Sequence, residues 1–403
     1  MSYRASRKRL SLMMFLQYAA PGVFIPILSH YLKNYLLFTP FQVGVILAMP
    51  AVAAIIAPFP AVWAADRLIA AERLLGVCHF CAGIVMLWLS QQKHFLPFLS
   101  IYFIYGLLFA PTFALTNAVS FHHIEDAKRD FGAIRMWGPI SWVVVGWGFS
   151  MLWLRNESLG APGSRLPHAL IFSGIASMML GAYAFALPKG KKTNDKPPSP
   201  LSALSIFTQR NMLILCGVTL LNAAVHQFYY YGMSPYLNQI GLSNQYILPA
   251  MSLGQLGEIF MLFSLGFFLR RLGIKTTLVI GVLSQAIRCA VFAFAGLPWV
   301  LAVIPSHGIC YAFFFTTAFI YVDLHSTAET RAGAQQLFNL LISGFGTLLG
   351  NLIAGKMATL FFDNVSRQID FTKFWSMSIL GAVTLSLVLI LFFHEEKEEA
   401  LSQ

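Results

Sequence analysis

The chain has 403 residues, of which 57% are hydrophobic and 11% are charged, and its mean hydropathy is +0.68. Soluble domains carry about 25% charged residues, so this composition excludes a water-soluble globular protein and predicts a chain that lies in lipid. The formal net charge of +11 would suit nucleic-acid binding, but the basic residues are scattered over short loops, which indicates membrane topology instead.

Apolar runs of about 17–25 residues recur along the chain, and each is long enough to cross a bilayer as a helix. The sequence predicts twelve spans, at residues 9–33, 41–64, 73–91, 95–120, 133–154, 167–187, 211–237, 245–269, 276–295, 298–322, 334–358 and 372–394. The first span follows Arg7, Lys8 and Arg9. Its apolar stretch is too long for a signal peptide, so we expect a retained helix.

The distribution of Lys and Arg predicts the orientation of the spans. With twelve spans both termini share one side, and the loops there hold about 19 basic residues, against about 6 in the opposite loops. The positive-inside rule therefore predicts cytoplasmic termini, in a bacterial-type inner membrane.

The long polar stretch from Pro188 to Arg210 is rich in Pro, Lys and Ser, as linkers are. It predicts an N-terminal six-helix half at 1–187, a cytoplasmic linker at 188–210 and a C-terminal six-helix half at 211–403. The segment GAIRMWG at Gly132 is weakly similar to GAQQLFN at Gly333, as expected of parallel repeats. The loop from Gly266 to Lys275 resembles the glycine-and-basic loop of the major facilitator superfamily. That resemblance implies an all-α membrane protein whose twelve helices form two pseudo-symmetric halves.

Several kinds of chemistry lack their motifs. No G-x-x-x-x-G-K-[ST] loop for ATP is present, and no Ser/His/Asp arrangement stands out. Gly344, Gly346 and Gly350 lie inside an apolar run, which favours close helix packing over dinucleotide binding. The pair Cys78 and Cys81 lies in mid-span without a second pair, so we expect no metal and no cofactor. A secondary transporter or channel remains, rather than an enzyme.

Glu258 is the acid that lies deepest inside a predicted span, and Gln255 is adjacent to it on one helix face. Polar side chains at mid-depth usually face a wet cavity or one another, and they mark transport pathways. A carboxyl that takes up a proton on one side and releases it on the other can couple proton flow to solute movement. Glu258 is therefore predicted to be a proton site, a ligand for a polar solute, or both. The alternative is an ion pair between Glu258 and Arg288 that locks two helices together.

Other polar groups fall on particular helix faces. Arg135 and Trp142 share a face of the fifth span, Gln227 and Tyr230 a face of the seventh, and His307 and Tyr311 a face of the tenth; His226 lies beside Gln227. Each has an ordinary alternative. An arginine at the end of a helix snorkels to water, the histidines pack by hydrogen bonding, and the tyrosines serve as wall.

Five stretches carry a resemblance to a known family: FLQYAAPG near Gln17, AADRLIAAERLLGVCHFCAG from Ala64, IRMWGPISW from Ile134, GQLGEIF from Gly254 and FFLRRLGIK from Phe267. They are similar to the nucleoside:proton symporter family, a branch of the major facilitator superfamily. The resemblance covers most of the chain and implies a central pocket, alternating access and proton coupling.

The family's binding residues, carried over position by position, give the candidate site. The resemblance implies proton coupling at Glu258 and substrate contacts at Arg135, Trp142, Gln227, Tyr230, Gln255, Glu258, His307 and Tyr311. Three positions depart from the family pattern: Pro139 replaces a threonine, Tyr230 an asparagine and Ala312 an aspartate. Loss of the asparagine and the aspartate removes groups that are expected to recognise the polar atoms of ribose or base.

The resemblance thus favours proton-coupled uptake of nucleosides. The departures lean toward a phenylpropionate-type permease, because arginine and histidine suit a carboxylate and the aromatic side chains suit a ring. Sugars are a further alternative, as is a non-transporting sensor with a carrier fold. The expected partners are a small-molecule substrate, protons and membrane lipid, with no nucleic acid, and the chain is expected to act as a monomer.

Overall fold

The computed structural model is almost entirely helical and describes residues 3–57, 69–124, 127–155, 165–187, 206–327 and 329–394. Contacts between residues divide the chain into two compact units. The N-terminal unit comprises Met1–Asn194 and Ser243–Ser252, and the C-terminal unit comprises Asp195–Leu242 and Leu253–Gln403. Of the predicted linker, residues 188–205 lie outside the described residues, so the boundary at 188–210 stays a prediction.

The helices of the N-terminal unit follow the apolar runs. They are α1 (Tyr3–Gly22), α2 (Ile25–His30), η1 (Tyr31–Tyr35), α3 (Pro40–Ile56), α5 (Ala71–Leu89), α6 (Phe95–Phe109), α7 (Thr112–His123), α8 (Ala127–Arg135), α9 (Trp137–Gly148), η2 (Phe149–Trp153) and α10 (His168–Ala184). Local sequence sets some boundaries. At the start of α3, Thr39 and Gln42 bond each other's backbone N–H in a capping box, directly before Pro40.

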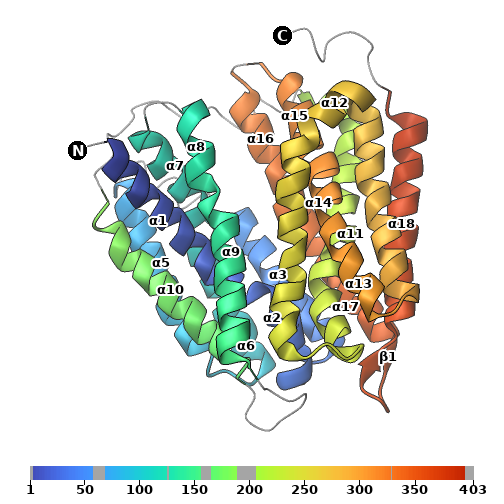
Figure 1. Cartoon of the computed structure of the whole chain (residues 1–403), viewed down its shortest axis with the longest axis horizontal. Coiled ribbons are helices and arrows are strands. Elements are labelled where there is room, and N and C mark those ends of the chain that lie inside the picture. The colour runs from blue at the N-terminus through green and yellow to red at the C-terminus, as the bar shows by residue number, and fades with distance from the viewer. Residues whose placement is uncertain are drawn as a thin grey trace. The chain divides into compact units, whose positions relative to one another are not determined.

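Glycines let helices of this unit approach closely. In Figure 1, α10 runs alongside α5, and the two helices pack together. A Cβ on Gly83 would lie 2.7 Å from the carbonyl oxygen of Gly174, and one on Gly174 would lie 3.0 Å from that of Gly83. In lipid, association of helices rests on such close packing, because the surrounding acyl chains are as apolar as the side chains.

The C-terminal unit contains the remaining helices and one small hairpin. They are α11 (Arg210–Gln239), α12 (Asn244–Phe294, with its first turns in the other unit), α13 (Leu297–Val303), η4 (Ile304–Ser306), α14 (His307–Ile309), η5 (Cys310–Thr316), α15 (Thr317–Leu324), α16 (Arg331–Asn339), η6 (Leu340–Gly346), α17 (Thr347–Leu360), β1 (Phe362–Asp363), β2 (Gln368–Ile369) and α18 (Phe371–Phe392). α11 packs against α17 and α18. A Cβ on Gly346 would lie 2.6 Å from Ala223 Cβ, and one on Gly350 would lie 2.5 Å from Ala224 O, so the predicted close packing at these glycines is confirmed.

Helix α12 joins two predicted spans, 245–269 and 276–295, without an intervening loop. The two helical parts meet at Gly273, whose φ of +74° lies in the left-handed region that glycine tolerates without strain. By length and apolar composition, eight helices among the described residues can cross a membrane, α12 being counted once. Two shorter apolar helices, α3 and α10, accompany them. The number of twelve crossings therefore stays a prediction.

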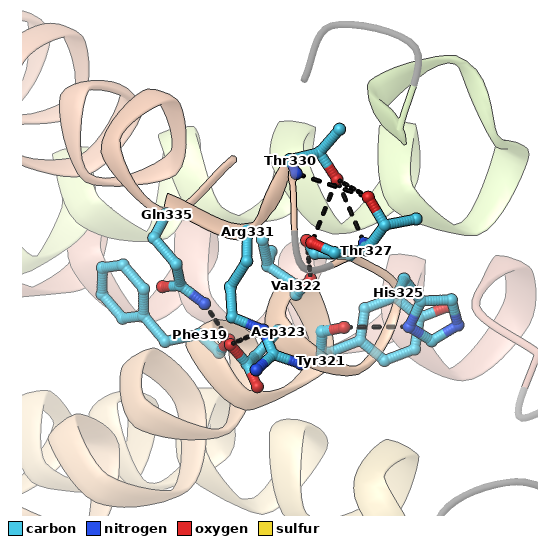
Figure 2. A network of polar contacts seen from close by, with 10 residues as sticks. Phe319, Tyr321, Val322, Asp323, His325, Thr327, Thr330, Arg331 and Gln335 are labelled. Carbon is cyan, nitrogen blue, oxygen red and sulfur yellow. Dashed lines mark hydrogen bonds and ion pairs between the residues drawn. The ribbon is translucent and has the colours of Figure 1, made fainter. Parts of the chain in front are cut away.

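Figure 2 shows the polar contacts that join the end of α15 to the start of α16. Arg331 Nε lies 3.1 Å from Asp323 Oδ1, and Gln335 Nε2 donates to the carbonyl of Phe319 at 3.0 Å. Both charged side chains are about half exposed, so water screens the pair and the contact orders the connection more than it stabilises the fold.

The last helix begins with a side-chain cap that follows an unpredicted hairpin. β1 pairs antiparallel with β2, and Arg367 between them takes φ +55°. The Asp370 carboxylate accepts a hydrogen bond from the backbone N–H of Lys373 at 3.1 Å, and it forms an ion pair with Lys373 Nζ at 2.9 Å. The hydrogen bond from the Lys373 side chain lowers the pKa of the Asp370 carboxyl.

Replacing Asp370 with Ala should destabilise the protein by about 1 kcal/mol, because the first turn of α18 loses its cap. Thermal unfolding of the detergent-solubilised protein measures the change. Since the folded-state pKa is lowered, the contribution is present above the carboxyl's unfolded pKa and is lost as the pH falls through the folded value. Asp370→Asn keeps an acceptor and should keep most of the stability. Equal loss in both variants would contradict a capping role.

Candidate substrate site

Six of the eight predicted substrate residues lie in the C-terminal unit. Gln227 and Tyr230 are on α11, Gln255 and Glu258 are on α12, His307 begins α14, and Tyr311 lies in η5. The Tyr230 ring meets the His307 ring edge-on, with centroids 6.1 Å apart. Tyr230 also lies within electrostatic reach of Glu258 and Tyr311. The structure therefore gathers Tyr230, Glu258, His307 and Tyr311 into one neighbourhood.

Glu258 lies where α12 meets the segment η4–α14 with backbone in contact. A Cβ on Gly257 would collide with the carbonyl oxygen of Pro305, and a Cβ on Gly308 would collide with the backbone nitrogen of Glu258. One turn earlier, a Cβ on Gly254 would lie 3.4 Å from His307 Cβ. The glycines therefore fix the distance between the helix that carries Glu258 and the one that carries His307 and Tyr311. Gly308 was not predicted to matter, because no rule of spacing along the chain reveals which glycine faces which.

Exposure distinguishes the members of this neighbourhood. Gln255 and Glu258 are half-buried, whereas His307 is 1% exposed and Tyr311 is 39% exposed. Tyr311 lies in the π-helical turn η5, a kind of irregularity that is frequent at functional sites. Its neighbour Ala312 is fully buried against Leu265 and Phe313. The position where the family has an aspartate is thus apolar both in residue and in surroundings.

Gln227 makes its hydrogen bonds to α17. Its Nε2 donates to Thr347 Oγ1 at 3.3 Å, and its Oε1 accepts from Asn351 Nδ2 at 3.4 Å. Thr347 and Asn351 were not identified from the sequence. They are four residues apart on one helix face, and that spacing is the signal that could have indicated them.

A cluster of buried polar side chains adjoins Tyr230 in the C-terminal unit. The His226 ring lies 4.8 Å from the His307 ring, and Tyr229 lies 4.8 Å from His307 on another side. Gln285 Oε1 lies 3.1 Å from His226 Nδ1 and accepts from Cys310 Sγ at 3.3 Å. These contacts join α11, α12 and α14–η5 through polar atoms.

Arg288 belongs to this cluster. Its guanidinium carbon lies 5.1 Å from the centre of the Tyr229 ring, and the residue is 1% exposed. Neither Nε nor Nη1 has a hydrogen-bond partner among the described residues. The sequence pointed to Arg288 as a possible partner of Glu258 and gave no indication of the contact with Tyr229.

Arg135 and Trp142 lie in the N-terminal unit, and both are next to α1. The guanidinium of Arg135, at the end of α8, lies 4.4 Å over the ring of Tyr18. Trp142 on α9 is half-buried, and a Cβ on Gly22 would lie 3.1 Å from its Cα. Pro139 is half-buried on the same helix.

A hydrogen-bonded network in the N-terminal unit was not predicted. Gln17 Nε2 donates to Thr112 Oγ1 at 2.8 Å, and His79 Nε2 lies 2.8 Å from Gln17 Oε1. Since that oxygen is an acceptor, His79 donates from Nε2, and its Nδ1 accepts from Ser177 Oγ at 3.2 Å. All four residues are fully buried. The network ties α1, α5, α7 and α10 together. Within it, Nε2 and Oε1 of Gln17 and both ring nitrogens of His79 have hydrogen-bond partners. Among the described residues, no group of three metal-ligating side chains gathers around His79 or elsewhere.

Known proteins are similar to this chain over nearly its whole length. A family model described as Nucleoside H+ symporter matches residues 5–398. In Escherichia coli (strain K12), YegT is 32% identical over 97% of this chain and 94% of its own length, and xanthosine permease is 29% identical over 96% and 94%. The crystal structure of nucleoside transporter NupG superposes with a TM-score of 0.87 at 21% identity, covering 98% of this chain and 100% of that one.

The family match extends over nearly the whole chain, and the structural match gives the same fold from end to end. The predicted family and the predicted fold class are confirmed. Several apolar helices of the described residues are long enough to span a bilayer. The chain therefore belongs to the nucleoside H+ symporter family and is an integral membrane transporter with the major facilitator fold.

Proposed function

We propose that this chain takes up nucleosides together with protons by alternating access, and that Glu258 is the coupling carboxyl. The observation that carries the proposal is the place of Glu258 on α12, half-buried among mostly apolar neighbours in the chain and beside Tyr230. In such surroundings the neutral form of a carboxyl is favoured until water, a cation or a polar ligand reaches it. Loss and gain of its proton can then accompany each transport cycle.

Substrate contacts are proposed from chemistry and position. Tyr311 presents a 39% exposed ring on which a base can stack. Gln255 and Glu258 share one helix face and supply hydrogen bonds to polar edges, and His307 and Tyr230 enclose the same neighbourhood. Gln227 contacts the substrate, and its hydrogen bonds to Thr347 and Asn351 hold its side chain in place. The contacts from Arg135 and Trp142 rest on the family resemblance.

Nucleosides are favoured as substrates because of the family and because of the names of the relatives, which include a xanthosine permease and a nucleoside transporter. The buried, apolar Ala312 offers no carboxylate to ribose. Recognition of the sugar therefore falls to Glu258 and to the amides of Gln255 and Gln227.

We also propose that the chain works as a carrier without a catalytic step, as a monomer, with both termini in the cytoplasm of a bacterial-type cell. The excess of basic residues in the loops on the side of the termini supports the orientation. Large apolar side chains support contact with lipid: on α12, Phe260, Phe263 and Phe294 are 69%, 91% and 72% exposed.

Glu258→Gln should abolish the accumulation of uridine in proteoliposomes with an acidic exterior, because an amide of the same shape can neither take up nor release a proton. A proton that moves down 100 mV contributes about 2.3 kcal/mol, which supports an accumulation of about 50-fold. Radiolabelled uridine uptake, with and without the gradient, measures the loss. Exchange of uridine at equal pH should persist.

Two controls accompany this substitution. Glu258→Asp keeps an ionisable group and should keep part of the accumulation, and Asp323→Asn removes an exposed acid of the same unit and should have no effect. Full gradient-driven accumulation by Glu258→Gln would exclude the coupling role.

The substrate class is tested separately, by measuring how far uridine, xanthosine and 3-phenylpropionate each raise the unfolding temperature of the protein. A rise with the arylpropionate alone would exclude nucleosides as the substrate class.

Gly308→Ala should reduce uridine uptake at least about 10-fold and destabilise the protein by about 1–3 kcal/mol, since the added methyl forces α12 away at Glu258. Gly217→Ala on α11 is the matched control, because a Cβ there meets nothing within 4 Å. That change should be neutral or slightly stabilising. Uptake and thermal unfolding are measured on both variants, and equal behaviour of the two would refute the positioning by Gly308.

A further inference from the structure

Arg288 is a cation buried in the interior of the C-terminal unit, and its charge lacks a direct hydrogen-bond acceptor at two of its nitrogens. The residue is 1% exposed, and Nε and Nη1 have no partner among the described residues. A guanidinium stays protonated in proteins. Taking such a charge out of water costs several kcal/mol unless an opposite charge and hydrogen bonds compensate.

The ring of Tyr229 supplies part of the compensation. The guanidinium lies 5.1 Å from the centre of that ring, and a desolvated cation–π contact contributes about 2 kcal/mol. The Tyr229 ring does not accept hydrogen bonds from the N–H groups in the guanidinium plane, and it does not neutralise the charge. A negatively charged acceptor is the group that does both.

Other buried polar atoms of the same cluster also lack hydrogen-bond partners among the described residues. Gln285 lies three residues before Arg288 on α12, hence on the same face. Its Oε1 faces His226 and Cys310, which leaves its Nε2 amide group, also buried, with no partner among the described residues. The Tyr229 hydroxyl and His307 Nδ1 are likewise buried and without a hydrogen-bond partner. The cluster therefore offers donors from Arg288, the Gln285 amide and the Tyr229 hydroxyl beside a fixed positive charge.

Three acids of this unit have partners other than Arg288. Asp323 pairs with Arg331, Asp370 pairs with Lys373, and Asp363 accepts bonds from Val365 and Ser366. Among the described acids, Glu258 is the one linked to Arg288 through a common neighbour, since both lie within electrostatic reach of Tyr230. Glu258 is thus the alternative counter-ion that an experiment has to separate from an external one.

We propose that Arg288, the Gln285 amide and the Tyr229 hydroxyl form a buried binding site for a small inorganic anion such as chloride. Burial favours a small ligand over a large one: Arg288, Gln285 and His307 are each 1% exposed, and Tyr229 is 4% exposed. A monovalent halide balances the single charge of the guanidinium and accepts N–H and O–H bonds from several directions. With Arg288 neutralised in this way, Glu258 is free to bind and release a proton; this consequence alone rests on the proposed function.

The test is the thermal unfolding of the purified protein in sodium chloride and in sodium gluconate at constant ionic strength. Chloride, titrated against gluconate, should raise the unfolding temperature saturably by at least about 2 °C, and bromide should act similarly. Arg288→Gln should abolish this rise. Arg271→Gln is the matched control, because Arg271 lies 5.0 Å over the Phe267 ring but is exposed; its response to chloride should equal that of the parent protein.

A second variant keeps the test decisive if Arg288→Gln does not fold. Gln285→Glu places a carboxylate of the same shape beside the guanidinium, so it should fold, show no response to chloride and match in gluconate the stability of the parent protein in chloride. A saturable response retained by Gln285→Glu, or by a folded Arg288→Gln, would overturn the proposal. Absence of a halide response in the parent protein would also overturn the proposal. If the parent protein does not respond and the Glu258→Gln variant does, Glu258 is the counter-ion of Arg288. The halide response needs no nucleoside, so failure of coupled uptake would leave it intact.

Discussion

Hydrocarbon offers no hydrogen bonds, and this constraint decides where the polar side chains of the chain lie. In water an unsatisfied amide or hydroxyl turns to solvent, whereas in a bilayer it must find a partner inside the protein or carry a cost of several kcal/mol. The N-terminal unit meets the constraint completely at one place. Gln17, His79, Thr112 and Ser177 bond one another across four helices, with the donor and acceptor roles fixed throughout. A network of that kind stabilises and orders the bundle without requiring any ligand.

The C-terminal unit meets the same constraint only in part. Its cluster has connected members, such as Gln285 with His226, and others whose donors end without an acceptor, such as Arg288. Polar groups of the second kind are those from which function is inferred inside a membrane. Both clusters consist of buried residues on several helices. They differ in whether their polar atoms have hydrogen-bond partners.

The sequence predicted the parts of the fold that depend on local pattern. Long apolar runs revealed the helices, and the motifs around Arg135 and Gln255 revealed the family, because hydropathy and motif spacing are properties of the chain itself. The packing of Gly346 and Gly350 was predicted because glycines in an apolar helix have few other uses. The hairpin before α18 was missed, since its strands of two residues carry no periodicity.

The candidate site was predictable as a set of residues and unpredictable as a set of contacts. Gln255 and Glu258 could be placed on one face from their spacing, but the contact of Gly308 with the backbone of Glu258 depends on how two distant segments cross. Gln227 likewise was identified as a polar group in a span, whereas its bonds to Thr347 and Asn351 needed the fold. The sequence suggested Glu258 as a possible partner of Arg288, whereas the ring of Tyr229 beside the guanidinium became evident only in three dimensions.

These contacts make Glu258 and the Arg288 cluster parts of one electrostatic system. Tyr230 lies within reach of both charges, and His307 touches both Tyr229 and Tyr230 through its ring. In a medium of low dielectric, the interaction between two charges is stronger than in water at the same distance, so the charge state of Glu258 affects the cost of burying Arg288. An ionised Glu258 contributes a negative charge that lowers the cost of the buried guanidinium, whereas a protonated Glu258 leaves that charge to be balanced by another anion. The proposed movement of protons through Glu258 is therefore linked to the charge of Arg288, because Tyr230 lies within electrostatic reach of both residues.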